Sequence, residues 1–221
     1  MNKVVAVIPI KTNNQRLPGK NTKLLGKYPL YHYMFKTVSQ VEGIDKIWVD
    51  SSDRDILNIA LENRFNTMER PKNLNLPETS GHDLLKFEID MLHLDDNDIL
   101  VQLFVTQPFI KSETLNSAVE LLKNNPNKTS VLALFEVENR FWYDGKPISH
   151  NPKLLEGTQY QKPIYCEAGF YVFRVGDFKK EGARVTDDFI EMIVDSNECV
   201  DIDTQTDFNY AEVIVNADKK I

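Results

Sequence analysis

The sequence predicts an α/β protein with three layers, in which a mainly parallel, twisted sheet carries helices on both faces. Two observations lead to this class. Short continuous apolar runs, typical of buried parallel strands, alternate with segments whose apolar residues recur at helical spacing. No internal repeat or low-complexity linker interrupts the alternation, so residues 1–221 are expected to form a single domain.

The elements follow one another as strand, helix, strand and helix. Residues 4–10 form the first expected strand, because this apolar, β-branched run is too short for a helix and ends in a polar loop. Pro29 suits the first turn of a helix over residues 30–41. The other expected strands are residues 46–51, 99–104, 130–137 and 169–174, and the other expected helices are one capped by Asp53, residues 82–94, residues 113–124 capped by Ser112, and a final helix after Asp201 to Asp207.

Regular alternation stops between residues 138 and 165. Glycines and prolines are scattered there among aromatic and polar residues, which indicates an irregular hairpin excursion and not a separate domain.

Composition excludes several classes of protein. The net charge is -7, yet residues 1–41 hold seven Lys or Arg and no acidic residue, which leaves 19 basic and 33 acidic residues in the remainder. This balance argues against a general nucleic-acid binder, but it leaves room for one small basic pocket. Uncharged stretches are too short to span a membrane, and no secretory signal is expected. Two cysteines cannot build a disulfide framework, so a reducing cytoplasm is expected.

The polar loop after the first strand is the first candidate site. In open α/β sheets, ligands bind beyond the carboxyl ends of the strands. This loop, residues 11–21, offers Lys11, Arg16 and Lys20 together with amide and hydroxyl donors, which suits a polyphosphate. It matches neither the Walker A nor the dinucleotide-binding glycine pattern. Charge runs usually face water, so a solvated loop is the alternative.

Asp201 and Asp203 form the second candidate site. In an extended segment, residues i and i+2 face the same way, so both carboxylates can point at one Mg²⁺ ion. The alternative is that one of them only caps the final helix. Thr204 and Asp207 already fit a capping box there, which leaves the two upstream aspartates without a structural task.

Taken in order, several segments resemble the cytidylyltransferase family that activates acidic sugars, such as sialic acid and Kdo, as CMP-sugars. The matching segments are Val7-Ile8-Pro9-Ile10-Lys11, Leu17-Pro18-Gly19-Lys20-Asn21, Leu25-Gly26-Lys27-Tyr28-Pro29-Leu30, Val49-Asp50-Ser51-Ser52-Asp53, Arg70-Pro71-Lys72-Asn73-Leu74, Val105-Thr106-Gln107-Pro108-Phe109 and Asp201-Ile202-Asp203-Thr204. The resemblance implies a Rossmann-like nucleotidyltransferase fold and transfer of CMP from CTP to a sugar, with release of pyrophosphate, for surface glycan synthesis.

The resemblance also implies roles for single residues. Lys20 and Lys11 would hold the CTP phosphates and, with Asp203, form the catalytic set. Asp201 and Asp203 would bind Mg²⁺. The full nucleotide-binding set would be Lys11, Asn14, Arg16, Lys20, Asn21, Arg70 and Ser80.

The departures from the family pattern concern the acceptor sugar. Phe104 stands where sialic-acid members carry Gln, and Cys166 and Glu167 lie where those members place a basic residue for the sugar carboxylate. Because Glu167 would repel a carboxylate, the identity of the acceptor stays open.

By resemblance, residues 141–165 form an arm that pairs two copies into a homodimer. Their aromatic side chains suit an interface, although packing on their own domain is the alternative.

Two rival functions fit parts of the sequence. A metal-dependent glycosyltransferase would place its Asp-x-Asp near mid-chain and lack a strongly basic first loop. A non-catalytic nucleotide-binding protein fits the altered acceptor residues, but both aspartates and Lys20 are retained.

Overall fold

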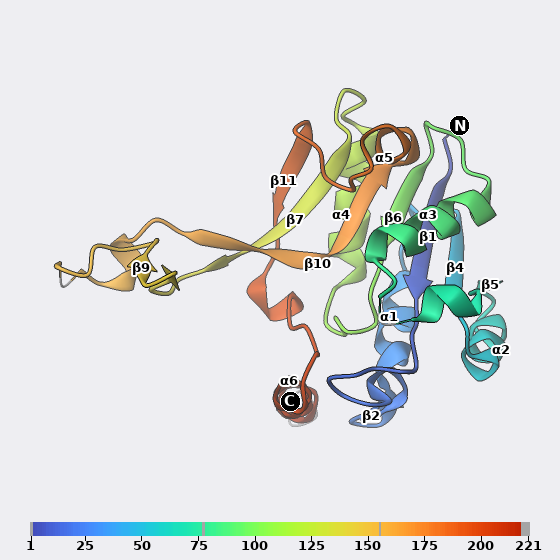
Figure 1. Ribbon diagram of the computed structural model, residues 1–221, viewed down its shortest axis with the longest axis horizontal. Helices are drawn as coiled ribbons and strands as arrows, with labels where there is room; N and C mark the ends of the chain where they lie inside the picture. Colours follow the sequence, from blue (N-terminus) through green and yellow to red (C-terminus); the bar gives the residue numbers. More distant parts are fainter. Residues whose placement is uncertain (1, 77, 155, 218–221) are drawn as a thin grey trace.

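The computed structural model describes residues 2–76, 78–154 and 156–217, and one sheet dominates this part of the chain. Seven strands lie in the order β11-β7-β10-β6-β1-β4-β5 (Figure 1). Strand β10 runs antiparallel to β6 and β7, whereas the other neighbouring pairs are parallel. The strands are β1 (Val4–Pro9), β4 (Lys46–Ser51), β5 (Asn66–Glu69), β6 (Ile99–Gln102), β7 (Ser130–Val137), β10 (Ile164–Arg174) and β11 (Phe189–Ile193).

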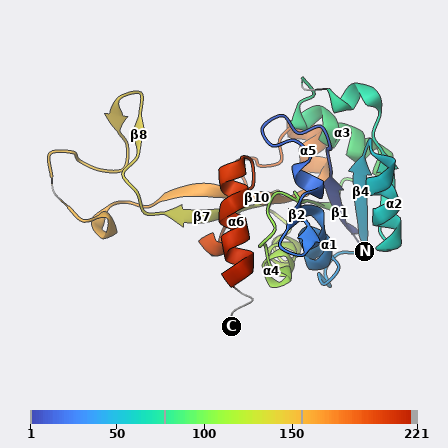
Figure 2. The same ribbon diagram turned by 90° about the horizontal axis from the view of Figure 1, so that it is seen from below.

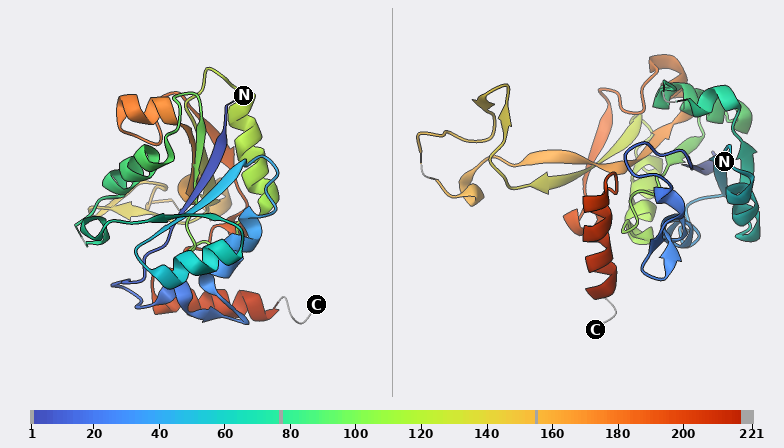
Figure 3. Two further views of the ribbon diagram at one scale, coloured as in Figure 1. Left: turned by 90° about the vertical axis from the view of Figure 1, so that its right-hand side faces the viewer. Right: turned by 60° about the horizontal axis from the view of Figure 1, so that its bottom comes forward.

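Helices cover both faces of this sheet, as predicted (Figure 3, left). They are α1 (Leu30–Val38), α2 (Arg54–Glu62), α3 (Gly81–Leu92), α4 (Ser112–Lys123), α5 (Val175–Glu181) and α6 (Gln205–Ala217). Helices α1, α2 and α4 pack on one face of β1 through Ala6 and Ile8, and α3 and α5 pack on the other through Val5 and Val7. The alternation follows from the pleat, which turns successive side chains to opposite faces. The fold is therefore the three-layer α/β arrangement.

The predicted elements are present, with shifts at several ends. Strands 46–51 and 130–137 match to the residue, whereas α1 ends at Val38 and not at residue 41. Asp53 caps α2 by accepting hydrogen bonds from the backbone N–H groups of Asp55 and Ile56. None of the described helices is long and apolar enough to cross a bilayer.

The predicted cap of α4 is wrong. Ser112 is the first residue of the helix and not its cap. The carboxylate of Glu198 instead accepts hydrogen bonds from the backbone N–H of Lys111 at 2.9 Å and from the hydroxyl of Thr114 at 2.7 Å. Glu198, which is distant in sequence, therefore supplies the hydrogen-bond acceptor at the beginning of α4.

A third apolar cluster joins the two ends of the chain. Leu17 and Leu25, from the loop after β1 and the short strand β2 (Leu24–Leu25), pack with Ile202 and with Phe208 of α6. Strand β2 pairs with β3 (Tyr28–Pro29) just before α1. Because this cluster is buried, it fixes the segment before α6 beside the loop that leaves β1.

The excursion projects away from the body as an arm (Figures 1 and 2). The long strands β7 and β10 stay paired out to Val137 and Ile164, so the arm grows directly from the sheet. Beyond them, β8 (Trp142–Tyr143) and β9 (Lys146–Pro147) form a small hairpin, followed by the 3₁₀ turn Thr158–Tyr160. Most of its large apolar residues are exposed: Trp142, Tyr143, Ile148, Leu154, Tyr160 and Tyr165.

Candidate active site

The candidate site lies at the carboxyl edge of the sheet, between the loop after β1 and the segment before α6. The buried side chain of Ile202 anchors that segment in the third apolar cluster. Its backbone N–H also donates to the carbonyl of Thr106 in the loop after β6, at 2.9 Å. The two candidate sites from the sequence therefore form a single site.

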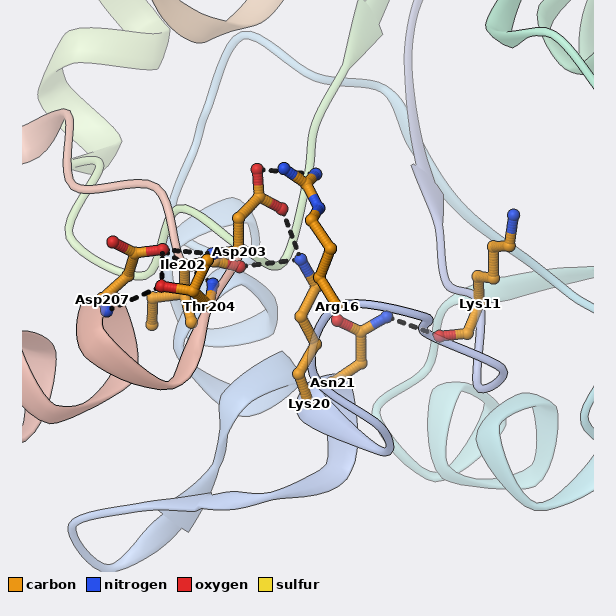
Figure 4. Close-up of polar contacts among 8 residues, drawn as sticks. All are labelled: Lys11, Arg16, Lys20, Asn21, Ile202, Asp203, Thr204 and Asp207. Atoms are coloured by element: carbon orange, nitrogen blue, oxygen red, sulfur yellow. Dashed lines mark hydrogen bonds and ion pairs between the residues drawn. The ribbon is translucent and has the colours of Figure 1, made fainter. Parts of the chain in front are cut away.

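Asp203 is held between two cations (Figure 4). The Lys20 Nζ lies 2.7 Å from Asp203 Oδ1, and an Arg16 guanidinium nitrogen lies 2.7 Å from Asp203 Oδ2. Lys20 is nearly buried and also donates to the carbonyl of Ile202 at 2.7 Å. The turn that delivers Lys20 requires a positive φ of 67° at Gly19, which glycine adopts readily. Lys20 is thus rigidly placed, whereas Arg16 reaches in from solvent.

The loop encloses a cavity of about 370 Å³ beside these ion pairs. Its lining consists of Lys11, Asn13, Asn14, Gln15, Arg16, Leu17 and Lys20. The side chain of Lys11 points away from Asp203, and its carbonyl accepts a hydrogen bond from the amide of Asn21 at 2.6 Å (Figure 4). The side-chain oxygens of Asn14 and Asn21 are buried without a protein donor. Buried polar atoms are normally hydrogen-bonded, so the cavity suits a ligand that carries both anionic groups and hydrogen-bond donors.

The capping task before α6 falls to Thr204 and Asp207, as predicted. The Asp207 carboxylate accepts hydrogen bonds from the backbone N–H groups of Thr204 at 2.7 Å and of Asp203 at 3.1 Å. The side chains of Asp201 and Asp203 are therefore not required as caps.

Asp201 and Asp203 are close enough to act on one another electrostatically. Desolvation raises the pKa of the Asp201 carboxyl, a hydrogen bond from Thr106 opposes the rise, and the charge of Asp203 adds to it. A cation bound between the two carboxylates would offset the repulsion between their charges. No group of three or more His, Cys, Asp or Glu side chains within the described ranges could hold a metal by itself. Two carboxylates nevertheless fit Mg²⁺, which takes its remaining ligands from water and substrate phosphate.

Arg70 lies apart from the ion pairs of the loop. Its guanidinium is buried against the buried carboxylate of Asp50, with a nitrogen–oxygen distance of 2.7 Å. Burial raises the pKa of Glu88 on α3 well above its usual range, and the neighbouring charge of Asp50 adds to the rise. A protonated Glu88 would leave this three-residue group near neutrality. A nucleotide-binding role for Arg70 stays a prediction.

Ser80 begins α3. Its hydroxyl accepts from the backbone N–H of Asp83 at 3.1 Å, and the Asp83 carboxylate reaches back to the backbone N–H of Ser80 at 3.3 Å. This capping box gives Ser80 a structural task, so its role near a nucleoside also remains a prediction.

One cluster at this edge was not predicted. The guanidinium of Arg184, in the loop between α5 and β11, stacks 3.7 Å from the centre of the Tyr171 ring. It also donates to the side-chain oxygen of Gln102 at 2.7 Å. Burial and a short hydrogen bond to Glu167 raise the pKa of Tyr171 to about 12, and the charge of Asp201 contributes to the rise. No local motif surrounds Arg184, so the sequence offered no signal for it.

The sequence matches the cytidylyltransferase family over residues 5–214. A CMP-N,N'-diacetyllegionaminic acid synthase from Legionella pneumophila is 24% identical, and the alignment covers 99% of this chain and 98% of that protein. An 8-amino-3,8-dideoxy-manno-octulosonate cytidylyltransferase from Shewanella baltica is 26% identical, over 62% of this chain and 55% of that protein. The chain therefore spans about half the length of the second relative.

Solved structures agree on the fold. A CMP:2-keto-3-deoxy-manno-octonic acid synthetase in complex with CTP superposes with a TM-score of 0.73 at 16% identity, covering 98% of this chain and 100% of that one. A 4-diphosphocytidyl-2C-methyl-D-erythritol synthase from Anaerococcus prevotii gives a TM-score of 0.67 at 17% identity, covering 97% and 96% of the two chains. With a family match that spans almost all of its residues, this chain belongs to the cytidylyltransferase family.

Proposed function

We propose that this enzyme transfers CMP from CTP to a hydroxyl of an acidic sugar and releases pyrophosphate, which supplies an activated sugar for surface glycan synthesis. The observation that carries the proposal is the placement of Asp203 between Lys20 and Arg16. It joins a cationic, cavity-forming loop to a pair of carboxylates within a cytidylyltransferase. The two relatives described above carry the names of enzymes that act on acidic sugars.

Few protein groups need to take part directly in making or breaking bonds in this reaction. In such a transfer, the sugar hydroxyl attacks the α-phosphate in line and pyrophosphate leaves, so catalysis depends on positioning and on neutralising negative charge. Lys20 is fixed by its carbonyl and carboxylate contacts and can hold phosphate oxygens in one place. The exposed side chain of Arg16 can turn from Asp203 to a phosphate, and Lys11 extends the positive surface of the cavity.

We assign Mg²⁺ to Asp201 and Asp203 as the cofactor. When bound, the metal would neutralise phosphate charge and acidify the attacking hydroxyl. The support for this assignment is the donor set, namely two adjacent carboxylates that are not needed as helix caps.

We further propose a homodimer formed through the arm, in the cytoplasm. An arm that exposes Trp142, Tyr143 and Tyr160 would bury apolar area against a second copy. Cys166 and Cys199 are free thiols, as a reducing compartment favours. Sedimentation of the Tyr143→Ser, Tyr160→Ser double variant tests the dimer. A wild-type monomer, or a double variant that remains fully dimeric, would contradict this assembly.

Pyrophosphate release tests the activity. Wild-type protein is incubated with Mg²⁺, each of the four nucleoside triphosphates in turn, and a panel of acidic and neutral sugars. Release is expected with CTP and an acidic sugar. Asp203→Asn should lower the rate at least about a hundredfold, since it removes a metal ligand and leaves Lys20 without its carboxylate.

The matched control is Asp55→Asn, which changes an exposed carboxylate on α2, far from the site. Its rate should equal that of the wild type. Absence of release with every pairing would refute the transferase proposal, and an unchanged rate in Asp203→Asn would refute the site.

A further inference from the structure

Arg184 presents a preorganised guanidinium at the carboxyl edge of the sheet. It is half-buried, and its aromatic and amide neighbours, Tyr171 and Gln102, lie opposite each other on β10 and β6. The ring of Tyr171 supports one face of the guanidinium, and the oxygen of Gln102 accepts from one of its two terminal nitrogens. An arginine held in this way loses little side-chain freedom when it binds a ligand.

A guanidinium has five N–H donors in a planar fork. The hydrogen bond to Gln102 uses one nitrogen, Nη1. Within the described ranges, no carboxylate lies within 4.0 Å of Arg184, so its charge is not paired. The nearby carboxylate of Glu167 accepts a hydrogen bond from the hydroxyl of the same tyrosine, Tyr171. The free edge of the fork matches a carboxylate, which arginine binds with two parallel hydrogen bonds.

Side-chain contacts and one short chain segment connect Arg184 to the candidate active site. Tyr171 meets the ring of Phe104 edge-on, with centroids 6.4 Å apart. Two residues beyond Phe104, Thr106 hydrogen-bonds to Asp201 through its side chain and to Ile202 through its carbonyl. Arg184 therefore stands on the β10 side of the aspartates, whereas the cationic loop stands on the β1 side.

This position separates two binding tasks. Lys11, Arg16 and Lys20 already line the cavity that suits a triphosphate. The attacking sugar must approach the same α-phosphate from the opposite side of that loop, because attack is in line with the leaving pyrophosphate. Arg184 lines a second cavity of about 340 Å³, with Gly81 and His82 at the beginning of α3.

We propose that Arg184 binds the carboxylate of the acceptor sugar and thereby determines the selectivity of this enzyme for acidic sugars. The inference rests on the proposed function. It assigns to the loop between α5 and β11 the task that the sequence comparison left open at Cys166 and Glu167. The positive charge of Arg184 also offsets the repulsion that Glu167 would exert on a carboxylate.

The test compares acceptor and nucleotide kinetics in three variants. Arg184→Ala removes the fork, Arg184→Lys keeps the charge but loses the two-point geometry, and Arg54→Ala changes an exposed arginine on α2 as the matched control. The probes are a 2-keto-3-deoxy sugar acid that the wild type uses and the same sugar with its carboxylate replaced by a primary amide.

Arg184→Ala should raise the KM for the sugar acid at least about tenfold, leave the KM for CTP within twofold, and abolish the preference for acid over amide. Arg184→Lys should recover part of the loss, and Arg54→Ala should match the wild type. Melting temperatures identify variants that fail to fold, and if Arg184→Ala is one of them, Arg184→Lys carries the comparison through its acid-to-amide ratio.

Two results would overturn the inference while leaving the transferase proposal intact. They are an equal loss with acid and amide, and a rise confined to the KM for CTP. A wild type that accepts only neutral sugars would overturn the inference together with the acidic-sugar part of the proposed function. Absence of pyrophosphate release by the wild type with any acceptor would overturn both proposals together.

Discussion

The buried carboxyl of Glu88 should make the stability of this protein depend on pH in a characteristic way. Glu88 and Asp50 are both inaccessible to solvent, and the buried guanidinium of Arg70 is ion-paired with Asp50. Burial raises the pKa of Glu88, so the folded protein keeps a proton that the unfolded chain releases above about pH 4.3. The folded state then binds more protons than the unfolded state, and stability falls as pH rises.

The magnitude follows from one proton per molecule. Each pH unit removes about 1.4 kcal/mol from the free energy of unfolding while the folded pair keeps its proton. Over two pH units through which the folded pair keeps its proton, the contribution amounts to about 3 kcal/mol, a large part of the ~5–15 kcal/mol typical of a domain. Glu88→Gln retains the shape and can still donate to Asp50, but it binds no proton. Its stability should gain about 3 kcal/mol relative to the wild type across this interval.

Urea unfolding at pH 5.5, 6.5 and 7.5, followed by tryptophan fluorescence, measures the difference. Asp90→Asn, an exposed carboxylate on the same helix, is the control and should follow the wild-type profile. Parallel profiles for the wild type and Glu88→Gln would show that Glu88 is charged in the folded state and would refute the reasoning.

Three further predictions concern single positions. Lys20→Met should lower kcat/KM for CTP by roughly a hundredfold or more, measured by pyrophosphate release, because it removes the fixed cation of the loop; a loss below fivefold would contradict that role. Gly169→Ala should destabilise the protein in urea clearly more than Gly145→Ala. Both glycines have positive φ, but only at Gly169 would an added Cβ lie 1.6 Å from the Gln107 side chain. Equal losses of about 1 kcal/mol would show that Gln107 moves aside freely. Asp53→Ala should cost about 1 kcal/mol of stability through loss of the α2 cap, with kcat unchanged.

Local patterns predicted most of the fold because its central strands are buried on both faces and its main helices carry one apolar face. The elements that were missed are short or lie at an edge. Strand β5 reads Asn66 to Glu69 and sits at one end of the sheet, where few apolar contacts mark it. Helix α5 has only seven residues. The reversed direction of β10 left no local signal, because strand direction depends on connections across the whole chain.

The candidate site was predicted where its residues are close in sequence, as in the loop after β1 and the pair Asp201 and Asp203. Contacts between distant residues could not be derived. Glu198 displaced Ser112 as the group that satisfies the beginning of α4. The burial of Arg70 depends on Asp50, from a neighbouring strand. A single charged residue in a loop, such as Arg184, has no pattern from which its neighbours can be inferred.

The ion pairs of Asp203 also set which anions can compete for the site. Without a ligand, Asp203 is ion-paired with both Lys20 and Arg16, and one positive charge of the three residues stays unbalanced. A bare phosphate or sulfate ion that takes both cations leaves the carboxylate unpaired, so its affinity is reduced by the energy of the pairs that it replaces. An anion that arrives with its own cation can pair with Lys20 and Arg16 while its cation pairs with Asp203. No charge is then left unpaired. The ligand-free site therefore discriminates against the simple inorganic anions that surround it and favours a nucleotide already complexed with a divalent ion.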